Sequence, residues 1–327
     1  MRALLVGLGS IGRRHLSNLR QIEPGASITV WHQHTRADVV PGADRVVYSL
    51  EAALAEKPEV ALIAGPAVTH IETGLALARE GIHLFIEKPL AHDAQQVEAL
   101  IALCHQSNLI MMVGYNLRFS APLRVMQQAA SDGRIGRLLG LRAEVGQYLP
   151  DWRKDTDYRQ GVSARRELGG GAILELSHEL DYARWLMGEV KTVSAQADRV
   201  GDLDIDVEDL AEITLRFQSG AIGQVHVDML QRAATRVCRL IGTEGTLTWD
   251  AIGNQVRLFE AATQTWSDLH PATSIDRNAM YVAELKHFLE CVAQRTPPLI
   301  GGEDGWRVLQ IALAAKQSAR EQRVIEL

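Results

Sequence analysis

Three glycines near the start of the chain restrict both the local backbone and the fold around them. Gly7, Gly9 and Gly12 form the pattern Gly-x-Gly-x-x-Gly, which follows an apolar run and precedes a helical pattern over 13–20. In this setting the first glycine permits a tight turn, the second lets the backbone approach a diphosphate, and the third lets helix and strand pack closely. The helix N-terminus then faces the diphosphate charge. The predicted cofactor contacts at this turn are Gly7, Gly9, Ser10, Ile11 and Gly12.

Short apolar runs alternate with helical patterns through the first 115 or so residues. We expect strands over 2–7, 27–31, 60–64, 83–86 and 110–113, and helices over 11–20, 50–56, 70–79 and 94–104. Strands separated by amphipathic helices form right-handed crossovers and a parallel sheet that is covered on both faces. Residues 1–119 are therefore predicted to form a doubly wound α/β domain of the Rossmann type.

The pattern changes after Asn116, where β-branched or alternating segments follow one another with turns between them. The expected strands are 138–147, 191–199, 210–217, 221–229, 236–242, 246–250 and 254–260. Strands without intervening helices form a mostly antiparallel sheet. One helix over 171–187 interrupts them, and two more, over 278–295 and 304–319, follow. Residues 120–327 are therefore predicted to form a second domain, of the α+β class, with a large open sheet. Two domains are expected because 327 residues are long for a single hydrophobic core.

Composition excludes several classes of partner. A net charge of −6 and a pI near 6.0 argue against broad attraction to nucleic acid or to an anionic membrane. Three cysteines without metal-type spacing indicate reduced thiols and no metal site. No apolar stretch approaches the roughly 20 residues of a membrane helix. We expect a cytoplasmic protein with no nucleic-acid or membrane partner.

The end of the second predicted strand bears on the choice of cofactor. A carboxylate normally binds the ribose hydroxyls there, but residues 31–36 contain no acid, and the next one is Asp38. His32 and Arg36, with Thr35, are placed to bind a 2′-phosphate instead, which favours NADP slightly over NAD. The alternative is that Arg36 only opens the next helix.

A lysine follows the fourth predicted strand at the edge where a nicotinamide cofactor would end. Glu87, Lys88 and Pro89 come directly after the buried run 83–86, and ligands of doubly wound sheets lie beyond the carboxyl ends of the strands. A cation there can bind a substrate hydroxyl and reduce the cost of its deprotonation. The alternative is a solvated surface charge.

The predicted helix over 171–187 carries a proton-transfer candidate. His178 is a natural general base because imidazole titrates near neutrality. Glu175, Asp181 and Tyr182 share its side of the helix with two large apolar residues, so this face is expected to meet a ligand or the other domain. A structural role for His178 remains the alternative.

The polar stretch over 149–170 is too long for a plain connection. Its arginines could bind a carboxylate or phosphate with paired donors, and its aromatic residues could stack on a sugar. The alternative is a solvated charged loop. The substrate-binding candidates in this stretch are Trp152, Arg153, Tyr158 and Arg159.

The order of these segments resembles the glucose–fructose oxidoreductase / inositol dehydrogenase (Gfo/Idh/MocA) family over nearly the whole chain. The matching segments are Gly7–Gly12, Gly65–His70, Glu87–Leu90, Gly114–Phe119, the glycine-led helix and Gly302–Gly305. Within the loop, the segments Asp151–Arg153, Asp157–Arg159 and Ser163–Arg165 resemble a branch of the family associated with modified sugars and nonulosonic-acid pathways.

The resemblance implies a Rossmann domain, a C-terminal domain whose open sheet joins a homodimer or homotetramer, and an active site between the domains. It implies that Lys88 and His178 act together at the nicotinamide, with Asn116 or Arg118 lining the pocket. Gly65, Pro66, His70 and Glu87 would lie along the cofactor. Family members often carry an aspartate four residues before the histidine; here Leu174 stands there, and Glu175 is the substitute.

The expected activity is NAD(P)-dependent hydride transfer between the nicotinamide and a secondary alcohol or ketone of a sugar, cyclitol or sugar derivative. The predicted catalytic residues are Lys88, His178 and Glu175, and the predicted substrate contacts also include Arg118, Asp181 and Tyr182. Two alternatives stay open: a redox-neutral enzyme that recycles bound NAD(P) for epimerisation, elimination or glycoside cleavage, and a non-catalytic nucleotide-binding sensor.

Overall fold

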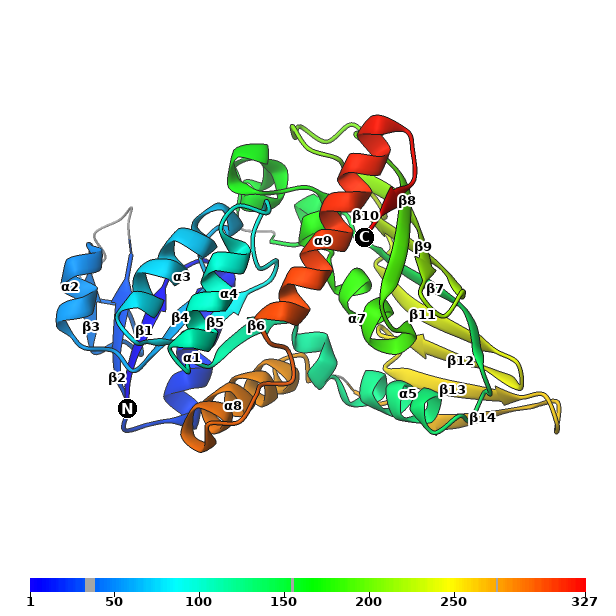
Figure 1. Cartoon of the computed structure of the whole chain (residues 1–327), viewed down its shortest axis with the longest axis horizontal. Coiled ribbons are helices and arrows are strands. Elements are labelled where there is room, and N and C mark those ends of the chain that lie inside the picture. Colours follow the sequence, from blue (N-terminus) through cyan, green and yellow to red (C-terminus); the bar gives the residue numbers. More distant parts are fainter. Residues whose placement is uncertain (33–38, 154–155, 275) are drawn as a thin grey trace. The chain divides into compact units, whose positions relative to one another are not determined.

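The computed structural model describes residues 1–32, 39–153, 156–274 and 276–327, and the chain divides into two compact units (Figure 1). The first unit contains Met1–Asn116 and Arg277–Arg307, and the second contains Leu117–Asp276 and Val308–Leu327. The predicted second domain spans all of 120–327. The structure places Arg277–Arg307 in the first unit because helix α8 packs on helix α1, a contact between distant parts of the chain.

The first unit is built on a six-stranded sheet in which every pair of neighbouring strands is parallel. The strand order is β3-β2-β1-β4-β5-β6, so the direction of winding reverses at β1. This confirms the predicted doubly wound sheet and adds β3, which is too short to show as a pattern. The strands are β1 (Arg2–Val6), β2 (Ser27–Trp31), β3 (Arg45–Val47), β4 (Val60–Ile63), β5 (His83–Glu87) and β6 (Met111–Gly114).

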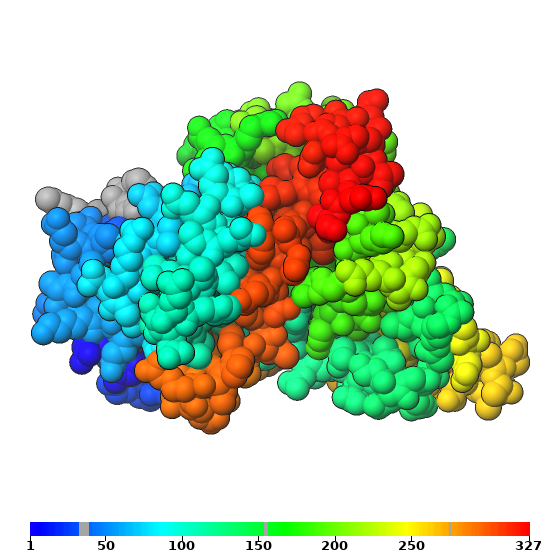
Figure 2. Space-filling model, viewed as in Figure 1, coloured from blue at the N-terminus to red at the C-terminus, as the bar shows by residue number. Residues whose placement is uncertain are grey.

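The helices of this unit include one that comes from much later in the chain. They are α1 (Ser10–Ile22), α2 (Leu50–Ala55), α3 (His70–Arg79), α4 (Val97–Gln106) and α8 (Ala279–Gln294). Asn18 of α1 and Asn278, which precedes α8, exchange side-chain amide hydrogen bonds of 3.2 and 2.8 Å. The orange surface of α8 adjoins the blue surface of the N-terminal segment (Figure 2). The helix that follows the glycine turn is thus supported by a segment about 260 residues away.

The second unit is built on a nine-stranded sheet in the order β14-β13-β12-β11-β7-β10-β9-β8-β15. Only the central pair β7 and β10 is parallel, which confirms the predicted, mostly antiparallel sheet. The strands are β7 (Leu138–Gly146), β8 (Val190–Asp198), β9 (Leu210–Phe217), β10 (Ile222–Asp228), β11 (Thr235–Gly242), β12 (Gly245–Asp250), β13 (Gln255–Glu260), β14 (Thr265–His270) and β15 (Ile325–Glu326).

Helices of this unit pack on one face of the sheet (Figure 1). They are α5 (Ala121–Ser131), α6 (Ala172–Glu175) and α7 (His178–Met187); α9 (Gly302–Glu321) runs from the first unit into the second. Strand residues that point toward the helices, such as Leu141, Val225 and Leu240, are fully buried, and alternate residues face outward.

The prediction of one continuous helix over 171–187 is wrong, because two helices occupy this segment. Leu176 leaves the helical region with φ −103° and ψ 29°, which separates α6 from α7. His178 is therefore the first residue of a new helix rather than a residue in the middle of a long one. The break also changes the grouping of residues by face that a single helical period had predicted.

A histidine on the outer face of the sheet joins two carboxylates. His226 Nδ1 lies 2.7 Å from Glu212 Oε1, and its Nε2 lies 2.9 Å from Asp228 Oδ2. These hydrogen bonds, first to Asp228 and then to Glu212, raise the pKa of His226 to about 9. Asp228 also accepts the backbone N–H groups of Leu230 and Gln231, so its carboxylate organises the turn after β10.

We expect His226→Gln to destabilise the protein by on the order of 2 kcal/mol at pH 7. Because the folded pKa is raised, the contribution is fully present below the unfolded value near 6.5 and is lost as pH rises through about 9. Urea denaturation of both proteins at pH 7 and pH 10 measures this. A difference in unfolding free energy that is the same at both pH values would contradict the assignment.

Candidate active site

The glycine turn after β1 packs directly against the turn after β4. Gly7 has φ +93°, and a Cβ there would lie 2.9 Å from Gly65 N. A Cβ on Gly12 would lie 2.2 Å from Gly7 O. Neither position has room for a side chain, so the two turns and the start of α1 form one rigid edge at the carboxyl ends of β1 and β4.

The N-terminus of α1 is open above this edge. Gly9 is the N-cap residue, no side chain caps the helix, and its first turn contains no acid. A Cβ on Gly9 would meet no atom within 4 Å. Helix N-termini present unpaired N–H groups and a partial positive charge. The residues present therefore fit the diphosphate of a dinucleotide, with Gly9, Ser10, Ile11 and Gly12 supplying the cradle.

Gly9→Ala should separate ligand binding from folding. The new methyl group has space in the protein, so we expect the unfolding free energy to change by less than about 1 kcal/mol. The same methyl group would occupy the approach of a diphosphate and should weaken NAD(P)H binding about tenfold or more. Gly25→Ala is the matched control, because Gly25 also has open space around its Cβ position. Unchanged cofactor affinity in Gly9→Ala would place the diphosphate elsewhere.

His70 joins two of the turns at this edge. Its Nδ1 lies 3.0 Å from Pro89 O and its Nε2 lies 3.0 Å from Gly65 O. Burial lowers the pKa of His70. His70 is 1% exposed, and its two ring nitrogens contact the backbone of both turns, so its side chain holds the turn at Gly65 next to the exit of β5. A direct cofactor contact by the His70 side chain, as predicted, does not fit this burial.

Glu87 and Lys88 stand at the exit of β5 with different surroundings. The Glu87 side chain is 8% exposed and its Oε1 lies 2.6 Å from His15 Nε2 of α1. Its Oε2 accepts the backbone N–H of Lys88 at 3.1 Å. Lys88 is half-buried. The carboxylate predicted to lie along the cofactor is therefore engaged by the protein itself, whereas Lys88 beside it is less deeply buried.

Two further residues of the first unit complete this end of the site. Asn116 is 4% exposed and hydrogen-bonds Tyr281 of α8. Burial raises the pKa of Tyr281, and the Arg14 guanidinium lies 4.4 Å from the centre of its ring. Sequence reasoning missed Tyr281, because only the fold brings α8 to α1.

At the end of β2, His32 is half-buried, while Arg36 lies outside the described residues.

In the second unit, two buried ion pairs anchor the helix that begins at His178. The Asp181 carboxylate accepts hydrogen bonds from Arg118. The Nε group lies 3.1 Å from Oδ1 and 3.0 Å from Oδ2, and Nη2 lies 2.7 Å from Oδ1. Glu179, which is fully buried, lies 3.0 Å from Arg236 Nε of β11. His178 itself is half-buried. The first turn of α7 is thus fixed on both sides of His178, as a positioned proton-transfer group requires.

Three predicted substrate contacts lie in the interior instead. Arg118 and Asp181 are 3% and 0% exposed and pair with each other. Tyr182 is fully buried, its ring packs edge-on against Trp249 at 5.6 Å, and burial raises its pKa. These side chains are buried in the structure, and their contact with substrate stays a prediction.

The described part of the loop over 149–170 contains four short turns, η3 (Leu149–Asp151), η4 (Tyr158–Gln160), η5 (Val162–Ala164) and η6 (Arg166–Leu168). Trp152 Nε1 donates to Gln147 O at 2.9 Å, and the Arg159 side chain pairs with Asp157 at 2.8 and 2.9 Å. The Tyr158 hydroxyl accepts Asp204 N at 3.3 Å, and Arg153 is exposed. These bonds link the described parts of the loop, and both Arg153 and Arg159 are exposed.

Glu175 receives a short hydrogen bond from this loop. Ser163 Oγ donates to Glu175 Oε2 at 2.6 Å, which ties η5 to the end of α6. Glu175 is half-buried, three residues before His178. The catalytic role of Glu175, as the substitute for the family aspartate, stays a prediction.

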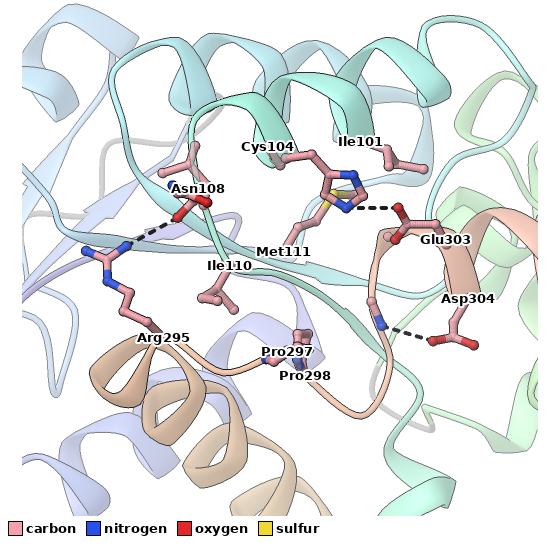
Figure 3. A pocket seen from close by; sticks show the side chains of 14 residues that line it. Ile101, Cys104, Asn108, Ile110, Met111, Arg295, Pro297, Pro298, Glu303 and Asp304 are labelled. Carbon is pink, nitrogen blue, oxygen red and sulfur yellow. Dashed lines mark hydrogen bonds and ion pairs between the residues drawn. The ribbon is translucent and has the colours of Figure 1, made fainter.

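A cavity of about 850 Å³ lies elsewhere in the first unit (Figure 3). Its walls come from the end of α4, the start of β6 and the segment after α8, and Arg295 Nη1 donates to Asn108 O across one side at 3.3 Å. His105 Nε2 lies 2.9 Å from Glu303 Oε1 at its margin. The cavity is at the amino end of β6, the edge opposite the glycine turn, and none of the predicted site residues lines it.

Two protein-family models match this chain, one over each of the two sheets. Residues 1–115 match the model described as an oxidoreductase family with an NAD-binding Rossmann fold, and residues 123–248 match the GFO/IDH/MocA C-terminal domain. The chain belongs to the GFO/IDH/MocA family. Its first unit is thus an NAD-binding Rossmann fold, and Gly7, Lys88 and Asn116 fall within or directly beside the first matched range.

Characterised GFO/IDH/MocA relatives match over the full length of the chain. The myo-inositol 2-dehydrogenase of Thermotoga maritima is 29% identical, covering 100% of this chain and 98% of that protein. The scyllo-inositol 2-dehydrogenase (NAD(+)) of Bacillus subtilis is 25% identical, covering 100% and 96%. A levoglucosan dehydrogenase solved in complex with NADH shares the fold, with a TM-score of 0.88 at 22% identity, over 100% of this chain and 98% of that one.

Within the described ranges, no helix is long and apolar enough to cross a membrane. Nor does this part of the chain bring three or more His, Cys, Asp or Glu side chains together as metal ligands.

Proposed function

We propose that this protein is an NAD(P)-dependent dehydrogenase acting on a secondary alcohol of a sugar, cyclitol or sugar derivative. The observation that carries the proposal is the open N-terminus of α1, which has no cap and no acid, in the same unit as Lys88 at the exit of β5. The first feature suits a diphosphate and the second suits the oxygen at a reacting carbon. The inositol dehydrogenases among the full-length relatives support the substrate class.

When bound, the nicotinamide supplies hydride acceptance and donation at C4. Lys88 binds the substrate hydroxyl and stabilises the alkoxide that develops as hydride leaves. His178 takes the hydroxyl proton, and in the reverse direction it returns the proton while Lys88 polarises the ketone.

Two finer features belong to the same proposal. His32 and Arg36, with no acid between them, favour NADP slightly over NAD. The outer face of the nine-stranded sheet is proposed to join a homodimer or homotetramer. On it, the exposed Arg142 and Arg239 stand directly opposite each other on neighbouring strands, and like charges so placed are unfavourable without a partner.

The test is a parallel titration of nucleotide-stripped protein with NADH and NADPH, followed by cofactor fluorescence. We expect saturable binding, tighter for NADPH, and then substrate-dependent reduction of the oxidised cofactor in a screen of cyclitols and sugars. Tighter binding of NADH would reverse the NADP preference alone. Binding without net reduction, together with turnover of substrate, would favour redox-neutral chemistry, and binding of neither by folded protein would reject the proposal.

A further inference from the structure

A histidine in the fingerprint helix is linked to the residue that precedes Lys88. His15 lies three residues after Gly12, and its Nε2 is 2.6 Å from Glu87 Oε1. The two side chains are 0% and 8% exposed. Neither presents a surface to a ligand, so the contact works inside the protein.

The second oxygen of Glu87 extends this link to the lysine. Glu87 Oε2 accepts the backbone N–H of Lys88 at 3.1 Å. One carboxylate therefore connects α1, whose N-terminus is proposed to bind the diphosphate, with the peptide that carries the proposed catalytic ammonium. We propose that His15 and Glu87 are positioning residues that set the location of Lys88 relative to α1; this rests on the proposed function of Lys88.

Packing leaves the pair little freedom. The His15 ring stands edge-on to Phe85 at 5.1 Å, and Phe85 stands edge-on to Phe288 of α8 at 5.7 Å. A Cβ on Gly114 would lie 3.2 Å from Glu87 Cδ, so the end of β6 closes the other side of the carboxylate. The aromatic contacts hold the ring and the backbone of β6 holds the acid.

The hydrogen bonding of the ring favours positioning over stabilisation. His15 Nδ1 is buried and has no hydrogen-bond partner among the described residues. An unpaired buried nitrogen costs stability, so this ring is a poor choice if stability alone is the purpose. What it provides is one donor, on a rigid ring, aimed at one oxygen of Glu87.

Replacement of His15 by two amides tests the link. The amide nitrogen of Gln comes close to the position of Nε2, whereas that of Asn comes close to Nδ1. We expect His15→Asn to lower kcat about 10- to 100-fold, because misplacement of a reacting group by about 1 Å can cost about 100-fold. His15→Gln should recover kcat to within about threefold of wild type. The Kd of the reduced cofactor should stay within about threefold in both, since α1 keeps its N-terminus.

A second measurement reads the link without any reaction. Hydrogen–deuterium exchange of the free protein reports protection of the Lys88 amide, which should be lost in His15→Asn and in Glu87→Met but kept in His15→Gln. If wild type shows no cofactor binding or turnover while the exchange pattern holds, the proposed function fails and the link stands. Unchanged exchange and unchanged kcat in His15→Asn would overturn the link, as would equal loss of kcat in the Asn and Gln variants with unchanged exchange.

Discussion

Lys88→Ala is expected to lower kcat by at least about 1,000-fold while the Kd of NAD(P)H stays within about threefold. Removing one group that stabilises a developing oxyanion typically costs about 100- to 1,000-fold, and Lys88 is also proposed to bind the substrate hydroxyl. The diphosphate contacts come from Gly9–Gly12, not from this ammonium, so the cofactor should still bind. Initial rates with saturating cofactor and a fluorescence titration measure the two quantities on the same preparation.

Lys286→Ala is the matched control for this variant. Lys286 is an exposed lysine of α8 in the same unit, so its loss removes the same charge without touching the exit of β5. We expect wild-type rates from it. If Lys88→Ala instead lost cofactor binding and kept its kcat at saturating cofactor, Lys88 would be a cofactor ligand and not a group that stabilises the alkoxide.

Arg118→Met is expected to reduce the free energy of unfolding by about 3–5 kcal/mol. The guanidinium meets both oxygens of Asp181, and the two side chains are 3% and 0% exposed. Its removal leaves a carboxylate without its cation in the core of the second unit, which is the costly way to break a buried pair. Urea denaturation at pH 7 measures the loss.

The double variant Arg118→Met/Asp181→Leu distinguishes this cause from simple loss of packing. With both charges removed, stability should return to within about 1–2 kcal/mol of wild type. Arg124→Met, at an exposed position on α5, is the control and should change stability by less than about 0.5 kcal/mol. A double variant no more stable than Arg118→Met would show that packing of the Arg118 side chain, for example its contact with Trp185 at 5.5 Å, dominates instead.

Most of the fold was predictable because its strands are short apolar runs with clear boundaries. The strands that sequence patterns missed are those without such runs. β3 has three residues, β15 has two, and β14 (Thr265–His270) is largely exposed, so none of them shows an apolar pattern. The break at Leu176 was also hidden, because the apolar spacing continues across it. Membership of Arg277–Arg307 in the first unit depends on a contact that no local pattern encodes.

The candidate site likewise has a part that the sequence predicts and a part that it does not. The glycine turn was predictable, because backbone conformation and close packing restrict residue type locally, and Gly7 and Gly12 show those restrictions directly. The residues with which charged groups form hydrogen bonds and ion pairs were not predictable from the sequence. Arg118 and Asp181 are 63 residues apart and His15 and Glu87 are 72 apart, so chemistry that suggests ligand binding in the sequence is used for internal pairing in the fold.

The contact between α1 and α8 also sets the order in which the chain can mature during synthesis. A nascent chain that has released residues 1–116 has all six strands of the parallel sheet, but Asn18, His15 and Phe85 still lack the helix that packs beside them. That helix is made only after the whole nine-stranded sheet except β15. Domains generally fold as they emerge, N-terminal first. Here the unit that begins first on the ribosome is completed late, and until then its nucleotide-binding edge is supported from one side only.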